Sequence, residues 1–104
     1  MNKPLCDEQK TITLHNKTHT TLTAKNKRIA TFGPHKGKWI LYKEYHLAPG
    51  ESVTTEFFTT DEHQISIYTG TKNGPDKSLY MIRDFDLTDG DHLALSDESY
   101  TLLK

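Results

Sequence analysis

The sequence predicts an all-β protein, a single antiparallel β-sandwich of seven or eight short strands. Short segments alternate between apolar and polar side chains, which is the period of a half-buried strand. Turn residues such as Pro-Gly, Asn-Gly and Asp-Gly recur roughly every eight to twelve residues, as they do in sandwiches and small barrels. No helical periodicity of useful length interrupts this pattern.

The expected strands follow one another with polar turns between them. They cover residues 10–15, 21–25, 28–32, 38–47, 52–58, 64–68, 78–85, 92–96 and 99–103. The segments 21–25 and 28–32 form one long bent strand or two short ones. Apolar side chains stand on both faces of 38–47, so we expect an interior strand there, covered on both sides. The segment 99–103 could add a strand that closes a sheet edge, which makes seven or eight strands in all.

Three turns carry specific expectations. Asn16 should bond the backbone two residues further on, because asparagine side chains mimic a turn in this way. Residues 48–51 (Ala-Pro-Gly-Glu) suit a type II turn, with proline second and glycine third. Asp89-Gly90 indicates a type I′ hairpin, in which 92–96 would pair back on 78–85.

Length and composition limit the organisation of the chain. With 104 residues we expect one domain at 10–104, preceded by a flexible arm at 1–9. The single cysteine, Cys6, allows no intrachain disulfide. The first residues lack the apolar stretch of a signal peptide, and no apolar run approaches the length of a membrane span. We therefore expect a protein that is cytoplasmic, or released without a recognisable signal peptide.

The net charge of −1 hides an asymmetry between the two halves. Residues 1–50 carry nine Lys/Arg and three Asp/Glu, whereas residues 51–104 carry four and eleven. Such an asymmetry indicates a charged partner, or two halves that interleave and neutralise each other across strands. The sequence leaves both interpretations open. No signature of a nucleic-acid-binding fold is present, so nucleic acid is disfavoured as the partner.

A basic loop at 33–37 has glycine at both ends and precedes the only tryptophan. Basic groups beside aromatic rings can bind phosphates and lie at a lipid headgroup layer. An exposed tryptophan favours a ligand-binding face, whereas a buried one belongs to the core. The candidate ligand-binding residues are His35, Lys36, Lys38, Trp39, Tyr42 and Tyr45.

Several short motifs occur in the order seen in one known family. They are an Asn-x-Thr turn followed by a leucine-rich strand (Asn16, Thr18, Leu22), then Gly37-Lys38-Trp39, then Pro-Gly-Glu-Ser with an aromatic residue beyond it (49–52, Phe57). Over residues 10–70 the chain resembles the aegerolysin-type β-sandwich. This resemblance implies a non-enzymatic module that binds membrane lipids, in some members together with a pore-forming partner. The acidic segment 84–98 replaces the Gly-, Trp- and Tyr-rich C-terminal segment of that family.

The acidic segment supports a second hypothesis, a protein-interaction or inhibitor module that acts on a basic partner. Residues 84–98 hold six acids and no base. The candidate partner-binding residues are Asp84, Asp86, Asp89 and Asp91. If they act together, their carboxylates should project from one face and binding should weaken with salt. Open sheet edges also allow self-association, although nothing in the sequence requires it.

The sequence gives no sign of a catalytic centre, a metal or a cofactor. The six histidines include His15-x3-His19 around a turn, but a zinc site needs three or four converging ligands. The acidic segment departs from the EF-hand spacing. Nucleophilic catalysis would need a Ser or Cys near an oriented His, and no Gly-x-Ser-x-Gly elbow is present. A small hydrolase is therefore the weakest of the three hypotheses, and we expect no cofactor.

Overall fold

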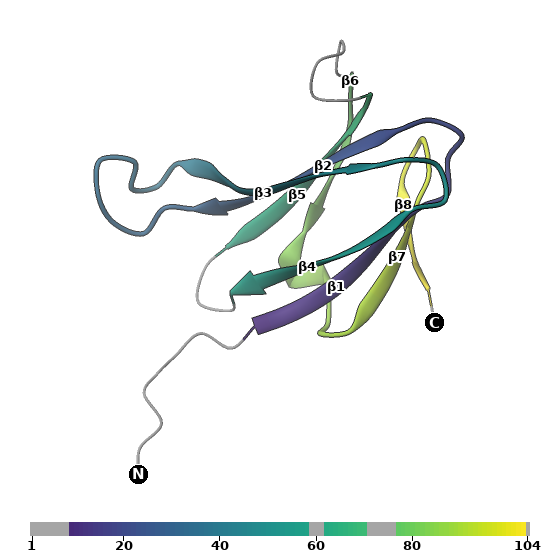
Figure 1. Cartoon of the computed structure of the whole chain (residues 1–104). Helices are drawn as coiled ribbons and strands as arrows, with labels where there is room; N and C mark the ends of the chain where they lie inside the picture. The colour runs from purple at the N-terminus through teal and green to yellow at the C-terminus, as the bar shows by residue number, and fades with distance from the viewer. Residues whose placement is uncertain (1–8, 59–61, 71–76, 104) are drawn as a thin grey trace.

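The protein is described by a computed structural model covering residues 9–58, 62–70 and 77–103. Two four-stranded sheets face each other (Figure 1), which confirms the predicted sandwich. The described strands are β1 (Gln9–Asn16), β2 (Leu22–Ile29), β3 (Trp39–Leu47), β4 (Ser52–Phe58), β5 (His63–Thr69), β6 (Lys77–Arg83), β7 (Asp91–Leu95) and β8 (Tyr100–Leu103), with a 3-10 turn η1 (Asp84–Asp86) after β6. The predicted arm at 1–9 lies outside the described residues, except Gln9, which begins β1.

The strand order shows how the chain alternates between the two sheets. One sheet, here called the β1 sheet, has the order β4-β1-β7-β8, and the other, the β2 sheet, has the order β3-β2-β5-β6. The described strand pairs are antiparallel, with one exception: β1 and β7 run parallel, with Ile12 beside Asp91 and Asn16 beside Leu95. As predicted, β8 closes one edge.

The core lies between the two sheets and is built by the alternation seen in the sequence. Every second side chain of β1, β2, β5 and β7 points inward, because successive side chains of a strand face opposite sides. The buried apolar cluster consists of Ile12, Leu14, Leu22, Ala24, Leu47, Phe57, Ile65, Ile67, Ile82, Leu87, Leu93 and Leu95.

The prediction that 38–47 is an interior strand is wrong, because β3 forms an edge of the β2 sheet. Its two-sided apolar pattern has another origin. Trp39 pairs with Ile29 and Leu41 pairs with Lys27 on the outer face of the sheet, where Leu41 remains 54% exposed. The apolar residues on that side therefore face solvent and are not covered by another layer.

The predicted hairpin at Asp89-Gly90 is also wrong. A turn does form, since the Asp91 N–H donates to the Thr88 carbonyl at 3.0 Å and Gly90 has φ +89°. However, no non-glycine residue in the described part of the chain has a positive φ, so Asp89 does not adopt the type I′ conformation. The turn carries the chain from β6 in one sheet to β7 in the other, and β7 pairs with β1 and β8 instead.

The other two turns form as predicted. Asn16 Oδ1 accepts from the Thr18 N–H at 2.9 Å, two residues further on, and its amide group donates to the Leu47 carbonyl at 2.9 Å. Gly50 has φ +82°, and the Glu51 N–H donates to the Ala48 carbonyl at 2.9 Å, as in a type II turn. This turn joins β3 to β4 and so connects the two sheets.

A buried polar network crosses the sandwich near the start of β5. Asn26 is fully buried, and its amide group donates to Thr55 Oγ1 at 2.9 Å and to the Glu56 carbonyl at 3.1 Å. Its Oδ1 accepts from His63 Nδ1 at 2.9 Å, which leaves His63 Nε2 to accept from the Phe58 N–H at 3.4 Å. The network thus joins the β2 sheet to β4 through side chains on both sides of the core.

Candidate functional site

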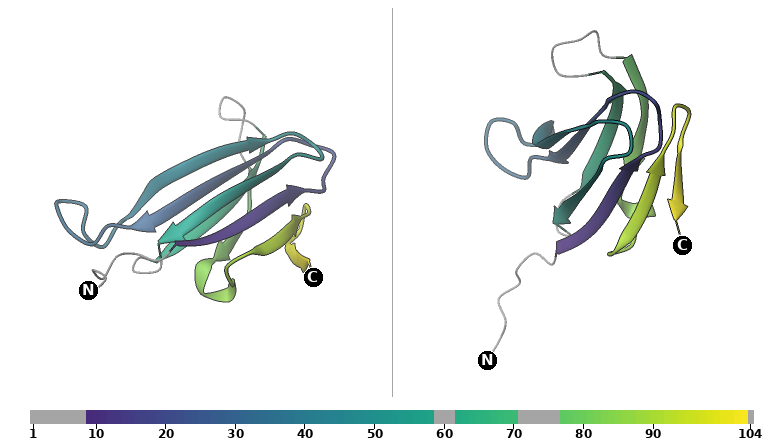
Figure 2. Two further views of the ribbon diagram at one scale, coloured as in Figure 1. Left: turned by 60° about the horizontal axis from the view of Figure 1, so that its bottom comes forward. Right: turned by 45° about the vertical axis from the view of Figure 1, so that its right-hand side comes forward.

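Strands β2 and β3 continue beyond the sandwich into a projecting hairpin end, residues 30–38, here called the β2–β3 tip (Figures 1 and 2). At its base the Ala30 N–H donates to the Lys38 carbonyl at 2.9 Å, and the Gly37 N–H donates back to Ala30 at 2.8 Å. Gly33 and Gly37 both have φ +84°, a conformation that glycine adopts without steric cost. The tip therefore has a defined backbone.

The side chains of the tip combine apolar and basic groups in contact with solvent. Phe32 is 80% exposed, the largest exposure among the large apolar residues of the described chain. Also exposed on the tip are His35, which lines a pocket together with Phe32, and the lysines Lys36 and Lys38. Three of the six predicted ligand-binding residues thus lie together on the tip. Phe32 was missed because the alternation of 28–32 indicates a strand, whereas β2 ends at Ile29.

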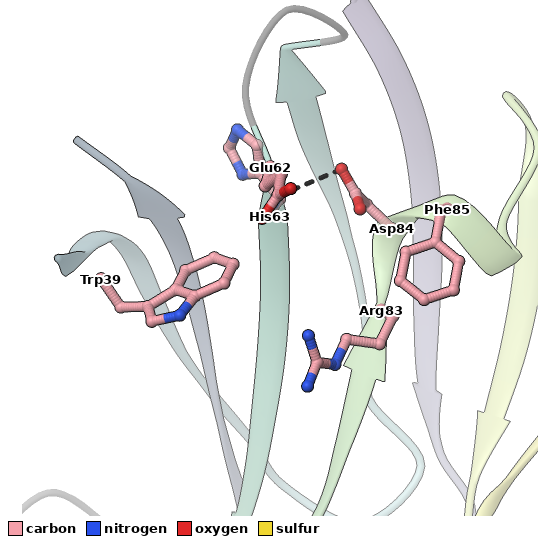
Figure 3. Close-up of a pocket in the computed structure, with 6 residues that line it drawn as sticks. All are labelled: Trp39, Glu62, His63, Arg83, Asp84 and Phe85. Atoms are coloured by element: carbon pink, nitrogen blue, oxygen red, sulfur yellow. Dashed lines mark hydrogen bonds between the residues drawn. The ribbon is translucent and has the colours of Figure 1, made fainter. Parts of the chain in front are cut away.

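Trp39 lies at the base of the tip and outside the core. It is half-buried on the outer face of the β2 sheet, which places it between the exposed and the buried tryptophan that the sequence left as alternatives. It lines a pocket of about 130 Å³ together with Glu62, His63, Arg83, Asp84 and Phe85 (Figure 3). In this pocket the His63 N–H donates to Asp84 Oδ2 at 3.1 Å.

A second pocket, of about 160 Å³, is formed by the tip, including Phe32, and by the adjoining ends of β2 and β3. Its lining is mainly apolar and consists of Arg28, Ala30, Thr31, Phe32, Pro34, His35 and Ile40. The Arg28 guanidinium lies 5.9 Å from the Tyr42 ring centre and 5.8 Å from that of Phe58. At this distance a cation is attracted to the faces of aromatic rings.

Tyr42 and Tyr45, the remaining predicted ligand-binding residues, do not join the tip. A β-bulge leaves Tyr42 without a partner in β2, and Tyr42 and Lys43 both reach Glu56 of β4, with bonds of 2.8 and 2.6 Å. Hydrogen bonds from Lys43 and then Tyr42 lower the pKa of Glu56. Burial and then the bond to Glu56 raise the pKa of Tyr42. Tyr45 packs on the core and donates to Thr55 at 3.0 Å.

Three of the four predicted partner-binding acids are engaged within the fold. Asp84 accepts from the His63 N–H, as described above. Asp89 Oδ1 accepts from the Thr11 N–H at 2.7 Å, and Asp91 Oδ2 accepts from the Thr88 N–H at 2.7 Å. Asp86 is exposed on η1. Asp84 thus accepts a backbone hydrogen bond at the start of β5, Asp89 one near the start of β1, and Asp91 one in the turn before β7.

Within residues 9–58, 62–70 and 77–103, no group of three or more His, Cys, Asp or Glu side chains is arranged to hold a metal ion. The same part of the chain contains no helix that is long and apolar enough to span a membrane.

Comparisons with known proteins add one finding about the fold. No family model matches the chain, and no curated protein matches it significantly. The fold is similar to that of the membrane-binding domain of pneumolysin, with a TM-score of 0.57 and 11% sequence identity over 93% of this chain and 97% of that domain. The fold thus defines the class: a small β-sandwich like this toxin domain.

Two longer toxin chains show the same likeness. A non-hemolytic pneumolysin from Streptococcus pneumoniae strain ST306 has a TM-score of 0.56 and 12% identity over 94% of this chain and 24% of the toxin. The cytotoxin suilysin from Streptococcus suis has a TM-score of 0.53 and 10% identity, also over 94% of this chain and 24% of the toxin. The chain thus spans about a quarter of the toxins it matches. The resemblance to aegerolysins is not tested by these structures and stays a prediction.

Proposed function

We propose that this protein is a non-enzymatic module that binds membrane surfaces through the β2–β3 tip, with anionic phospholipid headgroups as its partner. The observation that carries the proposal is Phe32, which is 80% exposed on the same tip as the exposed Lys36 and Lys38. An aromatic ring flanked by basic side chains suits the boundary between lipid headgroups and acyl chains. There the ring leaves water while the ammonium groups stay among phosphates.

The shape of the tip supports the same contact. The tip projects beyond the sandwich in both views of Figure 2, so it can reach a flat surface before the sheets do. Its hydrogen-bonded backbone holds Phe32 outward, which reduces the entropy lost on binding. The likeness to a domain named for membrane binding, and the aegerolysin-like motifs, point to the same class of partner.

The expected strength follows from the exposed groups. Burying a phenylalanine fully contributes about 1.5–3 kcal/mol, so inserting the exposed part of Phe32 should contribute roughly 1–2 kcal/mol, or about 5- to 30-fold in partitioning. Each lysine near an anionic bilayer adds about 1 kcal/mol, and salt screens this attraction. Binding should therefore require both the ring and the negative surface.

The test is co-sedimentation with vesicles of phosphatidylcholine alone or mixed with phosphatidylserine. We expect binding to the mixed vesicles, a loss of about 5- to 30-fold in Phe32→Ala, and a comparable loss in the double variant Lys36→Ser/Lys38→Ser. The matched control is Phe85→Ala, because Phe85 is 76% exposed but lies between Asp84 and Asp86. It should bind as the wild type does.

Two outcomes would overturn the proposal. One is that the wild type binds neither kind of vesicle, which would favour a protein partner for the tip. The other is that Phe32→Ala and Phe85→Ala lose binding equally, since the contact would then not be centred on the basic tip.

A further inference from the structure

Two histidines from distant parts of the chain meet on the outer face of the β1 sheet. His15 of β1 and His92 of β7 come together because these strands are parallel neighbours, with Thr13 beside His92. His15 Nε2 lies 2.9 Å from His92 Nδ1, and the ring centres are 5.1 Å apart with 20° between the ring planes. The two nitrogens therefore lie between the rings and face each other.

The other nitrogen of His15 is held as well. His15 Nδ1 lies 2.6 Å from Ser52 Oγ, and Ser52 is the residue opposite His15 on β4. When Ser52 Oγ accepts a hydrogen bond from Nδ1–H, the proton is fixed on that side and the Nε2 lone pair is available. Imidazoles that ligate metals are commonly oriented by a hydrogen bond of this kind on the second nitrogen.

The separation of the facing nitrogens, set here by their hydrogen bond, is close to that of two neighbouring ligands in one coordination geometry. With metal–nitrogen bonds of about 2.0–2.1 Å, adjacent ligands at 90° stand about 2.9 Å apart, whereas tetrahedral ligands stand about 3.3 Å apart. The His15–His92 distance of 2.9 Å matches the first value. Right-angled positions belong to the tetragonal complexes of Cu²⁺ and Ni²⁺, and Cu²⁺ binds imidazole most tightly among the first-row divalent ions.

We propose that His15 and His92, with Ser52 orienting His15, form a surface site for a late divalent transition-metal cation, with Cu²⁺ the preferred ion. The cation takes the place of the proton shared by the two nitrogens, that proton moves through solvent to His92 Nε2 so that both rings stay neutral, and each ring tilts so that its lone pair points at the metal. Both side chains reach solvent, so water completes the coordination. The site is independent of the proposed membrane contact, which uses the opposite sheet.

The sequence singled out His15 for a different reason, its spacing from His19. In the structure, the exposed His19 lies in the turn after β1, and the hydrogen-bonded ring partner of His15 is His92. His19 therefore provides a matched control, since it is a nearby solvent-exposed imidazole outside the pair.

The test titrates the full chain with Cu²⁺ and follows amide signals by NMR, where the paramagnetic ion broadens nearby resonances. We expect broadening centred on residues 13–16 and 91–94 in the wild type. Both His15→Gln and His92→Gln should lose this broadening, whereas His19→Gln should keep it. Ser52→Ala should weaken the affinity about tenfold, the lower end of the effect of removing an orienting partner.

Copper bound elsewhere on the chain broadens the wild type and the variants alike, so the difference between them reports the proposed site. Unchanged amide spectra before copper is added show that the variants are folded. The proposal is overturned if His15→Gln or His92→Gln is broadened like the wild type, or if broadening in the wild type centres elsewhere. The electron paramagnetic resonance spectrum provides a second measurement, because its nitrogen couplings count the imidazoles bound to copper. Two coordinated imidazoles support the site, and one or none contradicts it.

Discussion

Replacing Asn26 by alanine should destabilise the fold more than any exposed substitution in the same region. Asn26 is fully buried and makes three side-chain hydrogen bonds, to Thr55, to the Glu56 carbonyl and to His63. Thr55 would keep its bond from Tyr45, but the Glu56 carbonyl and His63 Nδ1 would each lose this partner. Each buried group that loses a hydrogen-bond partner costs roughly 1–3 kcal/mol, so the total for the two groups should be about 2–6 kcal/mol.

That cost is a large share of the roughly 5–15 kcal/mol that stabilises a typical domain. The assay is urea unfolding monitored by circular dichroism, with Thr54→Ala as the control. The Thr54 hydroxyl also makes a side-chain bond, to Thr13 at 3.0 Å, but on the exposed face, so its loss should cost less than about 0.5 kcal/mol. If Asn26→Ala costs no more than Thr54→Ala, the network does not stabilise the sandwich as argued.

Two further predictions concern the turn and the ion pair at the edge where β3 meets β4. Hydrogen bonds from Lys43 and then Tyr42 hold the pKa of Glu56 below its ordinary 4.5, so the folded chain binds fewer protons than the unfolded one. This stabilisation is present above pH 4.5 and is lost as the pH falls through the lowered pKa. Below pH 4.5 the wild type should therefore lose unfolding free energy faster than Glu56→Gln in urea titrations, and parallel curves would contradict the assignment. Gly50→Ala should cost about 1–2 kcal/mol from backbone strain alone, because no atom lies within 4 Å of the added Cβ. In thermal unfolding, the midpoint temperature of Gly50→Asn should lie between those of the wild type and Gly50→Ala. An unchanged midpoint for Gly50→Ala would refute a strained turn.

Features fixed by neighbouring residues could be predicted from the sequence. The Asn16 turn and the type II turn at Pro49-Gly50 depend on a few consecutive residues, and both form as expected. The strands likewise follow from local alternation, and most observed bounds fall within two residues of the expected ones. In the same way, glycines at both ends of 33–37 indicated the exposed loop that carries His35 and Lys36.

Features that depend on which strands become neighbours could not be predicted. The apolar pattern of 38–47 is the same for an interior strand and for an edge strand with a partly apolar outer face. Asp89-Gly90 indicates a turn, but not whether the chain returns to the same sheet. His15 and His92 are 77 positions apart, and only the parallel pairing of β1 with β7 brings them together. The exposure of Phe32 depends on where β2 ends, which alternation alone does not show.

The parallel pairing of β1 with β7 also has a consequence for how the chain is made and folded. β1 lies between β4 and β7, so it needs both neighbours before its backbone groups are satisfied. During synthesis β4 is complete about forty residues after β1, and β7 is complete only about forty residues after β4, with residues added at roughly 5–20 per second. For those seconds one side of β1 is open to pairing with another chain. Contacts so distant in sequence also slow folding, so we expect the completion of this sheet to be a late step.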